Sequence, residues 1–568
     1  MKSPISLIIA ALYSFGNVYS LQCQSINWMK SIGGADYENL YFASKDKTGN
    51  LYICGGFKDT IDIAPGEEQT FLISSQSYDP FVLITDQSGH LLHAHSLEGT
   101  GWDQATIIKA DNKLNYYIGG IFGNEIDLDP GPDTLMFISE INNNIFFQKF
   151  DNQNNLKWAF QLVTYSENDK LYDMEIDNEE NIYNVGSFTN TIDFDPGDNV
   201  FEMTASAERD VFIQKVDSAG QFIWAKRIGG WYESYAKTIA IDGLGNIVVA
   251  GSFKGEIDFD PGPDTLILSS EGVLDVFILK LDKDGNILWA KSFGGGSNDG
   301  VRELKIDREE NILICGGFRF SADFDPDPDD EFIVEGGNWN DAYILKLDPN
   351  GNFKWVRTIG NDNSIYLQGF DNDSLNNIYL GINFEDPLDV HPGDSTIMIN
   401  PQGDTDFVIE KLSPTGDFQF AAAMGSQHMD YVKSILSINS ANTYAIGIFT
   451  GTPEYVLNNT TVNISSVGQA DIFLLNINEN TNNQSENQML FQEVFPNPSN
   501  GVFHIRHYSK LLLNNISVFG SRGELLNFTI QISNDLTTIN VTEEYQGLIF
   551  VKLNIPEGVK VYKILINN

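Results

Sequence analysis

Short apolar stretches separated by polar turns recur along most of the chain at a fixed interval. One such stretch is led by an acidic or amide residue, and its copies begin at Asp79, Asn144, Asp210, Asp275, Asp341, Asp406 and Asp471. Consecutive copies are 65 or 66 residues apart. A fixed period of this kind indicates one supersecondary unit repeated many times.

The best-preserved unit, residues 224–280, predicts four main strands. Apolar or alternating stretches lie at 224–230, 235–241, 247–253 and 276–281, and turns rich in Asp, Gly and Asn separate them. Stretches of this length between such turns are typical of strands joined as hairpins. No segment has the capped 3.6-residue period of a long helix. We therefore expect an all-β chain in which four-stranded sheets repeat radially, as in a β-propeller.

The surplus residues of each unit surround an Asp-Pro-Gly sequence, and they predict either an extra edge hairpin or a long loop. One strand of each unit carries an aromatic side chain at the same position, so these residues give the number of units. They are Trp28, His93, Trp158, Trp224, Trp289, Trp355 and Phe420. This count predicts seven units. The large rings indicate packing between neighbouring sheets and not contact with a ligand.

The two ends of the repeat region predict how the sheets close. The chain enters the repeat on the tryptophan strand, 26–32, and leaves it after the Asp-led strand, 471–477. Inside every internal copy these two strands are neighbours in a hairpin. We therefore predict that 473–477 pairs with 26–32, so that both ends build the seventh sheet and no sheet edge stays open.

Two tracts carry a resemblance to a known family. Residues 289–295 read Trp-Ala-Lys-Ser-Phe-Gly-Gly, and residues 242–253 combine an Asp-Gly-Leu-Gly-Asn turn with an apolar strand that ends in Gly-Ser-Phe. They resemble the seven-bladed β-propeller repeat family of bacterial secreted proteins over roughly residues 25–478. The resemblance implies the fold and no single activity.

The chain beyond the repeats predicts a separate module. An Asn-, Gln-, Ser- and Glu-rich linker at 479–492 leads into 493–568, which has the strand-turn pattern of a small β-sandwich. The motif residues of this module are Phe495, Pro496, Asn497, Pro498, Gly501, Gly523 and Gly547. Together they resemble the C-terminal sorting domain of the Por-type (type IX) secretion system of Gram-negative bacteria. The resemblance implies that the type IX machinery is a partner and that the sorting domain is removed near the linker.

The start of the chain and its charge agree with export. Residues 1–20 predict a signal peptide, with Lys2, an apolar stretch at 4–15 and a small-residue exit at 18–20. The predicted domains are thus the signal peptide at 1–20, a propeller at 21–478, the linker and the sorting domain. No later stretch reaches the ~18–20 apolar residues of a transmembrane helix. We expect a protein that passes through the periplasm and is either released or held at the outer-membrane surface.

With 34 Lys and Arg against 78 Asp and Glu, the net charge is −44. Such a charge repels phosphate backbones and excludes nucleic acid as a partner. Cys54 and Cys315 occupy the same slot of two repeats, and we expect them to be buried free thiols.

Repeated acidic turns are the candidate site residues. Their paired carboxylates are Asp127, Asp129, Asp193, Asp195, Asp258, Asp260, Asp323 and Asp325. Strand alternation places both carboxylates of a pair on one face. With loop carbonyls they are candidate ligands for Ca²⁺, which takes six to eight oxygens. The alternative is a turn that Asp caps, in which Pro restricts φ and Gly adopts a positive φ. The sequence leaves both interpretations open.

Motifs of catalysis are absent from the sequence. It contains no Gly-x-Ser-x-Gly elbow, no phosphate-binding loop and no His/Cys spacing typical of zinc. By analogy of fold, we expect a secreted, non-enzymatic scaffold for adhesion that binds an extracellular glycan or protein. One alternative is a polysaccharide hydrolase or lyase that uses carboxylates on one face of the ring. Another is a calcium-stabilised structural protein of the cell surface.

Overall fold

The computed structural model describes most of the repeat region and parts of the C-terminal module. The described residues are 24–64, 69–75, 77–140, 143–206, 208–360, 363–391, 396–440, 442–457, 460–479, 493–495, 502–506, 515–520, 525–532, 536–542, 545–555 and 558–566. The predicted signal peptide and nearly all of the predicted linker lie outside them. Contacts divide the chain into two compact units, and the boundary between them in the sequence lies between Asn478 and Glu479.

Four antiparallel strands in the same order recur in seven sheets of the first unit's described residues. The first three sheets contain β2 (Asn39–Lys45), β3 (Leu51–Phe57), β6 (Asp79–Thr85) and β7 (Leu91–Ser96); β8 (Gln104–Ala110), β9 (Tyr116–Phe122), β12 (Asn144–Phe150) and β13 (Leu156–Leu162); and β14 (Lys170–Ile176), β15 (Ile182–Phe188), β18 (Asp210–Val216) and β19 (Phe222–Gly230). The fourth and fifth contain β20 (Ser234–Ile241), β21 (Ile247–Phe253), β24 (Asp275–Leu281) and β25 (Ile287–Phe293); and β26 (Gly300–Ile306), β27 (Ile312–Phe318), β30 (Asp341–Leu347) and β31 (Phe353–Ile359). The last two contain β32 (Tyr366–Asn372), β33 (Ile378–Phe384), β36 (Asp406–Leu412) and β37 (Phe418–Met424); and β38 (Asp430–Asn439), β39 (Asn442–Phe449), β42 (Asp471–Glu479) and β1 (Gln24–Gly34).

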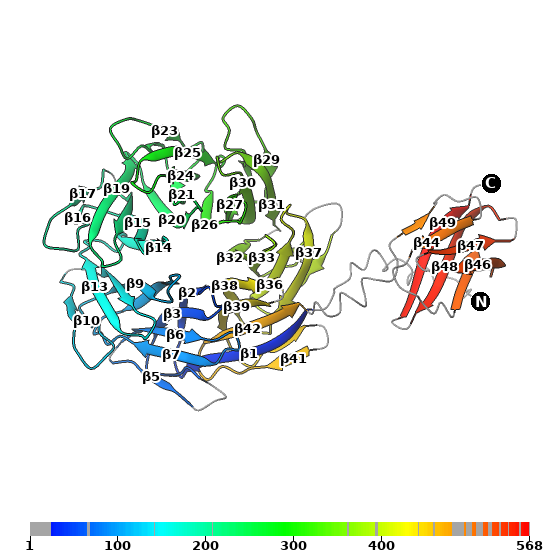
Figure 1. Ribbon diagram of the computed structural model, residues 1–568, viewed down its shortest axis with the longest axis horizontal. Coiled ribbons are helices and arrows are strands. Elements are labelled where there is room, and N and C mark those ends of the chain that lie inside the picture. Colours follow the sequence, from blue (N-terminus) through cyan, green and yellow to red (C-terminus); the bar gives the residue numbers. More distant parts are fainter. Residues whose placement is uncertain are drawn as a thin grey trace. The chain divides into compact units, whose positions relative to one another are not determined.

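The first strands of the seven sheets contact one another in an unbroken cycle. β2 contacts β8, and the contacts continue through β14, β20, β26, β32 and β38 back to β2. Figure 1 shows the sheets arranged around a common centre, and we call this arrangement the ring. In the seventh sheet β42 is the hydrogen-bonded neighbour of β1, and Asn27 Nδ2 donates to Asn476 Oδ1 at 2.9 Å. The predicted pairing of 473–477 with 26–32 is therefore confirmed.

A two-stranded hairpin between the second and third strands of each sheet accounts for the surplus residues. The hairpins are β4 (Thr60–Asp62) with β5 (Phe71–Ile73), β10 (Glu125–Asp127) with β11 (Met136–Ile138), β16 (Thr191–Asp193) with β17 (Glu202–Thr204), β22 (Glu256–Asp258) with β23 (Ile267–Ser269), β28 (Ser321–Asp323) with β29 (Ile333–Glu335), β34 (Leu388–Asp389) with β35 (Met398–Ile399), and β40 (Glu454–Leu457) with β41 (Thr460–Asn463). β4 pairs with the end of β1, and β22 with the end of β19. The hairpin of one unit thus extends the outermost strand of the preceding sheet.

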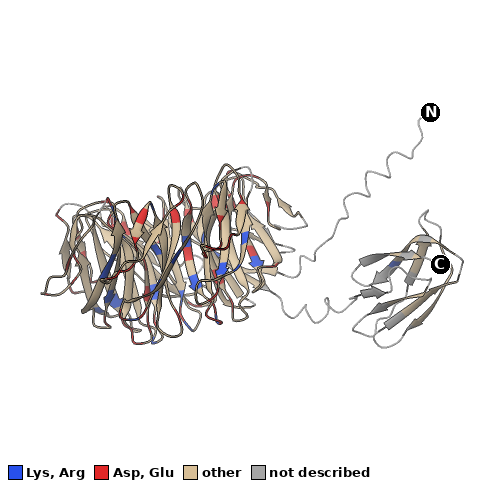
Figure 2. Ribbon diagram, turned by 90° about the horizontal axis from the view of Figure 1, so that it is seen from above, with Lys and Arg blue, Asp and Glu red and all other residues tan. Residues whose placement is uncertain are grey.

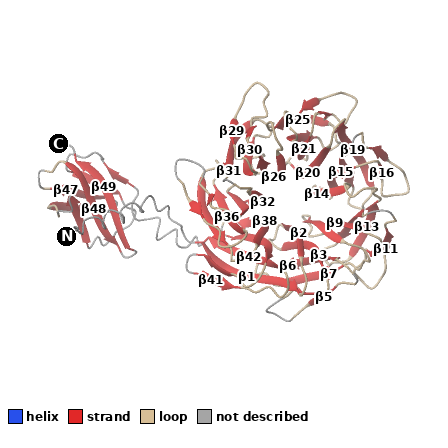
Figure 3. Ribbon diagram, turned by 180° about the vertical axis from the view of Figure 1, so that it is seen from behind, coloured by secondary structure: helices blue, strands red, loops and turns tan. Residues whose placement is uncertain are grey.

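The apolar core lies between successive sheets. Ile446 and Leu474 of the seventh sheet pack with Ile53 and Leu83 of the first. The second and third strands are therefore buried on both faces, and their sequences are almost continuously apolar. In Figure 3 no described residue is drawn as helix, in agreement with the all-β prediction. The described part of the chain accordingly contains no helix long and apolar enough to cross a membrane.

The tryptophan slot lies where two sheets meet. Trp158 packs on Tyr117 of its own sheet, with ring centroids 6.2 Å apart. Its indole also faces Gly220, in a turn of the next sheet, where an added Cβ would lie 3.1 Å from the ring. Gly220 has a φ of +78°, a value that favours glycine. The predicted packing role of this slot is confirmed, and Cys54 and Cys315 are buried free thiols as expected.

The acidic residues that lead the third strands are buried, and they cap the loops before them. Asp275 Oδ2 accepts a hydrogen bond from the Glu271 amide at 2.8 Å. A second carboxylate, Asp299 of the next sheet, lies beside it, since both approach to within 3.0 Å of the Cβ position of Gly294. Burial raises the pKa of Asp275 to about 6. Burial, reinforced by the charge of Asp275, raises the pKa of Asp299 to about 7.

We expect this carboxylate pair to make the ring more stable at pH 5 than at pH 8. Both pKa values are raised on folding, so the stability they contribute is complete below the unfolded values and is lost as the pH rises through about 6 to 7. At ~1.36 kcal/mol per pKa unit, the loss between pH 5 and pH 8 is about 4 kcal/mol per pair. Asp275→Asn should flatten the pH dependence of stability, because it removes one of the two titrating carboxyls. The ring should tolerate the change, since Asn144 already occupies the equivalent position in the second sheet. Thermal unfolding between pH 4.5 and 8.5 measures this, and equal slopes for both proteins would contradict it.

The described strands of the second unit form two sheets around one core. They are β43 (Glu493–Phe495), β44 (Val502–Arg506), β45 (Asn515–Gly520), β46 (Phe528–Ile532), β47 (Leu536–Val541), β48 (Gly547–Ile555) and β49 (Gly558–Ile566). The sheet orders are β43-β44-β47-β46 and β45-β48-β49. Phe503, Val518, Ile539 and Ile549 are buried together between them. The unit therefore has the small β-sandwich arrangement that its sequence predicts.

Candidate ligand pocket at the centre of the ring

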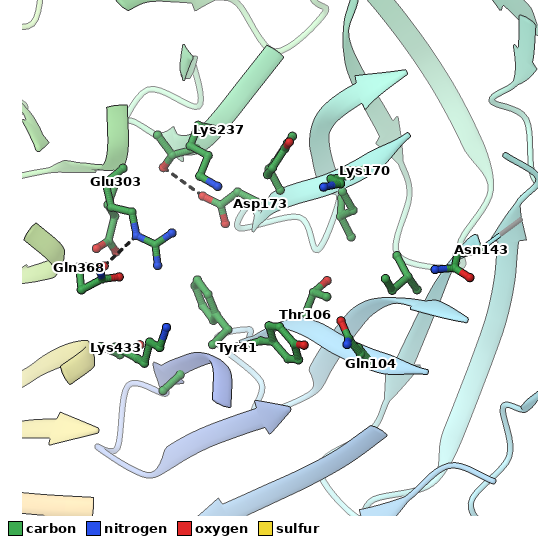
Figure 4. Close-up of a pocket in the computed structure, with 18 of the residues that line it drawn as sticks. Tyr41, Gln104, Thr106, Asn143, Lys170, Asp173, Lys237, Glu303, Gln368 and Lys433 are labelled. Atoms are coloured by element: carbon green, nitrogen blue, oxygen red, sulfur yellow. Dashed lines mark hydrogen bonds between the residues drawn. The ribbon is translucent and has the colours of Figure 1, made fainter. Parts of the chain in front are cut away.

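The seven first strands begin at the same end of the ring, which we call the entry face. A pocket of about 610 Å³ lies among these strands at that end. Each strand contributes its residue at one equivalent position, which we call the central position. The seven central positions are Tyr41, Thr106, Tyr172, Lys237, Arg302, Gln368 and Lys433, and all of them line the pocket (Figure 4).

A β-bulge in each first strand explains why the central positions face the pocket. In β8 the ladder register shifts between Ala105 and Ile107, which pack into cores on opposite faces of the sheet at 0% and 1% exposure. Thr106 is the extra residue of this bulge, so it lines the pocket and joins neither core. The same register shift surrounds the central position of the other six first strands. The bulge therefore determines which residues line the pocket.

A layer of ion pairs lies one step deeper, and we call it the floor. Asp173 and Glu303, which line the pocket, each pair with a lysine, at 3.6 Å to Lys109 and 3.2 Å to Lys305 respectively. Lys305 also contacts Asp371 at 3.4 Å, and Lys45 pairs with the same carboxylate. The charges of the floor thus compensate one another across several sheets. A second pocket of about 740 Å³ lies beyond, and it shares Asp173 and Glu303 with the first.

The central positions carry cations that are not compensated in this way. Lys237, Arg302 and Lys433 form no ion pair with any described residue, and the side chains of Lys237 and Lys433 point into the pocket in Figure 4. Burial, together with the charges of Arg302 and Lys170, lowers the pKa of Lys237 to about 8. Burial and Arg302 also lower the pKa of Lys433. Like charges therefore converge here in a chain whose net charge is −44.

Aromatic side chains line one side of the pocket at the entry face. Trp102, just before β8, lines the pocket with 58% of its surface exposed. Tyr172 packs on Tyr235 of the next sheet, with ring centroids 6.2 Å apart, and Lys237 Nζ lies 4.4 Å from the Tyr172 ring. Exposed rings beside cations can hold the face of a sugar or a flat polar group. The arrangement is therefore suited to binding.

The structure places the eight predicted aspartates on the edge hairpins, and none of them lines the pocket. In the second unit Asp127 Oδ1 accepts the amides of Asp129 and Leu135 at 3.0 and 2.8 Å. Asp129 Oδ1 accepts the Gly131 amide at 2.8 Å. The same bonds recur in the tracts that begin with Asp193, Asp258 and Asp323. These carboxylates therefore cap the turn, as the alternative interpretation describes. Its other expectation is wrong, because Gly131, Gly197 and Gly262 do not adopt a positive φ.

No described residues form a group of three or more His, Cys, Asp or Glu side chains arranged to hold a metal ion. Calcium binding stays a prediction. Since backbone amides already engage one oxygen of each carboxylate, we expect a calcium chelator to leave the melting temperature unchanged. Thermal unfolding with and without the chelator measures this. A melting temperature that falls with chelator and recovers with added Ca²⁺ would show that calcium stabilises the protein.

The sorting motif is only partly described. Phe495 ends β43 and Gly547 begins β48. The remaining motif residues, Pro496, Asn497, Pro498, Gly501 and Gly523, lie outside the described residues. Sequence reasoning missed the three cations of the central positions. Their signal is a repeat-to-repeat comparison, because Lys237, Arg302 and Lys433 share one slot that holds uncharged residues in the other four units.

Comparison with known proteins decides the nature of the C-terminal module. Residues 493–567 match the family described as the secretion system C-terminal sorting domain. The predicted sorting domain is confirmed. The protein is therefore exported by the type IX system to the cell surface or the extracellular space, and the type IX machinery is its partner.

The ring matches other proteins only in part. An uncharacterized WD repeat-containing protein of Acanthamoeba polyphaga mimivirus is 23% identical over 187 residues, which is 29% of this chain and 14% of the relative. The regulatory protein FlaEY of Caulobacter vibrioides is 27% identical over 176 residues, 30% of this chain and 17% of the relative. The chain thus spans less than a fifth of these relatives. A crystal structure of a protein of unknown function from Dyadobacter fermentans aligns with a TM-score of 0.35 and 10% identity, covering 80% of this chain and 99% of that one.

Proposed function

We propose that the ring is a seven-bladed β-propeller that, once exported, binds a glycan or a protein in its central pocket without catalysis. The observation that carries this proposal is the pocket at the entry face, where seven equivalent positions supply polar, charged and aromatic side chains. A concave site with a few convergent polar groups is the usual form of a ligand site. The residues at the centre differ from repeat to repeat although the frame around them is repeated, which suits specific recognition.

Three observations support the propeller itself. The sheets share one strand order, their first strands contact one another in a cycle, and β1 and β42 close the last sheet. The WD repeat named in the mimivirus relative is also a propeller signature. On this view residues 21–478 form the propeller, 479–492 the linker and 493–568 the sorting domain, with 1–20 as signal peptide.

A polysaccharide hydrolase or lyase is the second candidate, because Asp173 and Glu303 line the same pocket. Binding is favoured over catalysis because both carboxylates are engaged. Asp173 Oδ2 accepts bonds from Thr238 Oγ1 and the Ile239 amide, and Glu303 Oε2 accepts one from the Phe370 amide. With their lysine partners as well, they hold neighbouring strands together. A general acid or base has to be able to reach a substrate atom.

A glycan array on the secreted protein, run with a reducing-sugar assay on every glycan that binds, tests the proposal. The first variant is Thr106→Tyr, whose added ring fills part of the pocket. Tyrosine fits this position because Tyr41 and Tyr172 already occupy equivalent ones. The matched control is Thr204→Tyr, on the exposed hairpin strand β17. We expect binding that Thr106→Tyr loses and the control keeps, without release of reducing ends. Binding that Thr106→Tyr retains would contradict the pocket, and released reducing ends would favour the enzyme.

A further inference from the structure

Three of the seven central positions hold a cation, and they are neighbours or near neighbours around the axis. Lys237 lies on β20 and Arg302 on β26, while Gln368 of β32 separates them from Lys433 on β38. Lys170, the first residue of β14, adds a fourth cation at the rim of the same pocket. The three cations of the central positions thus lie on one arc of the pocket. Tyr41, Thr106 and Tyr172 lie on the opposite arc, where Lys170 shares β14 with Tyr172.

The cations of the floor and those of the central positions differ in their partners. In the floor, Lys109 and Lys305 each contact two carboxylates, so the buried charges compensate one another. One layer nearer the entry face, Lys237, Arg302 and Lys433 have no carboxylate partner among the described residues. A chain with 78 acidic residues has many carboxylates from which to supply one (Figure 2). Cations that face a cavity together repel one another and lose hydration, and both effects destabilise the ring.

Arg302 is oriented for a ligand. Its Nε donates to the Gln368 carbonyl at 3.0 Å, a bond drawn in Figure 4. This contact holds the guanidinium plane, and the Nη atoms make no hydrogen bond to a described residue. A guanidinium held in this way presents two parallel N–H groups, the arrangement that carboxylate and sulfate oxygens accept in bidentate form. Lys237 and Lys433 flank it as point charges.

We propose that the central pocket binds the anionic group of an acidic saccharide, with Arg302 as its bidentate partner and Lys237 and Lys433 as flanking charges. The opposite arc supplies the remaining chemistry, because Tyr41, Tyr172 and Trp102 offer rings for the face of the sugar. This inference rests on the proposed function and names the chemical class of its ligand. The net charge of −44 repels anions at long range, whereas the three cations of the pocket attract them locally.

The anion site is tested first with inorganic sulfate as the probe. The variant is Lys237→Met/Arg302→Met, and Lys254→Met with Lys58→Met is the control that removes equal charge outside the pocket lining. We expect sulfate, compared with chloride at matched ionic strength, to raise the melting temperature of wild type and control more than that of the pocket variant. Without sulfate, the pocket variant should melt at or above the wild-type temperature, since repulsion is relieved. Equal sulfate effects in all three proteins would overturn the inference.

The saccharide is tested with an oligogalacturonate and its methyl ester, which have the same sugar rings and differ in charge. Calorimetry should show binding of the acid to wild type and control, at least tenfold weaker binding of the ester, and loss of binding in the pocket variant. Equal binding of acid and ester would overturn the anionic preference and leave the proposed function standing. A sulfate response without binding of either sugar would overturn the proposal that the anionic ligand is a saccharide. An array without any pocket-dependent ligand would instead count against the proposed function.

Discussion

A chain that ends at residue 492 is expected to accumulate in the periplasm and to be absent from the cell surface and the medium. Residues 493–567 match the secretion sorting domain, and the contacts within the chain place this segment in a compact unit of its own. Removal of that unit takes away the signal that the export machinery reads, without removing any strand of the ring. The expected effect is a loss of export to background. Cell fractionation and immunoblotting of the full chain and the truncated chain measure it.

The folding of the truncated ring is the control for this result. Because its sheets and cores contain no residue beyond Glu479, the periplasmic product should unfold at the temperature of the full chain. A truncated chain that misfolds would be degraded, and its absence from the medium would then say nothing of sorting. Export of the folded, truncated chain at the normal level would contradict the assignment.

Deletion of β1 is expected to unfold the ring, although it removes only Gln24–Gly34. Ile26 and Ile32 of this strand are buried at 4% and 3% exposure, and each contributes about 1.5–3 kcal/mol through burial. Without β1, the hydrogen-bonding edge of β42 and the buried side chains of Phe473 and Leu474 face solvent. The burial energies of these four side chains add up to a free energy comparable to the whole stability of a typical domain, about 5–15 kcal/mol. Circular dichroism and sedimentation should therefore show loss of cooperative unfolding, and aggregation.

The contrast with the sorting-domain truncation makes the β1 prediction specific. Loss of a short N-terminal strand should destroy the ring, whereas loss of a whole C-terminal module should leave its stability unchanged. A β1-deleted protein that stays monomeric and unfolds cooperatively at the wild-type temperature would contradict closure by the terminal strands.

Most of the fold could be predicted because the repeat supplies the same information many times. Any single apolar stretch, such as 247–253, is ambiguous between a strand and a short buried helix. The Asp-Gly-Asn turns resolve this ambiguity, and in the structure Asp242 Oδ1 accepts the amides of Leu244 and Asn246 at 2.9 and 2.8 Å. The closing pair followed from chain order alone, since 26–32 and 471–477 are the two halves of a hairpin that is intact in every internal copy.

The site could not be predicted to the same degree. The acidic turns drew attention because they recur, but recurrence in Asp127 and its equivalents reflects a turn that every edge hairpin needs. The pocket residues are recognisable by the opposite property. Tyr41, Lys237 and Gln368 share a slot and differ in chemistry, because packing constrains only the neighbours of the central position. Their convergence depends on the ring radius and on strand orientation, which sequence spacing does not contain.

A disulfide between β1 and β42 tests the central claim, that strands from opposite ends of the ring close it, most directly. Asn27 and Asn476 lie on these strands, and their side chains meet in a hydrogen bond of 2.9 Å between Nδ2 and Oδ1. We therefore expect Asn27→Cys with Asn476→Cys to bring two thiols side by side across the strand pair. The native Cys54 and Cys315 are buried, and each single variant serves as control. The closed ring predicts spontaneous bond formation in the exported protein, seen by mass spectrometry under non-reducing conditions, with a raised melting temperature. Two thiols that stay free in the folded double variant under oxidising conditions would contradict it.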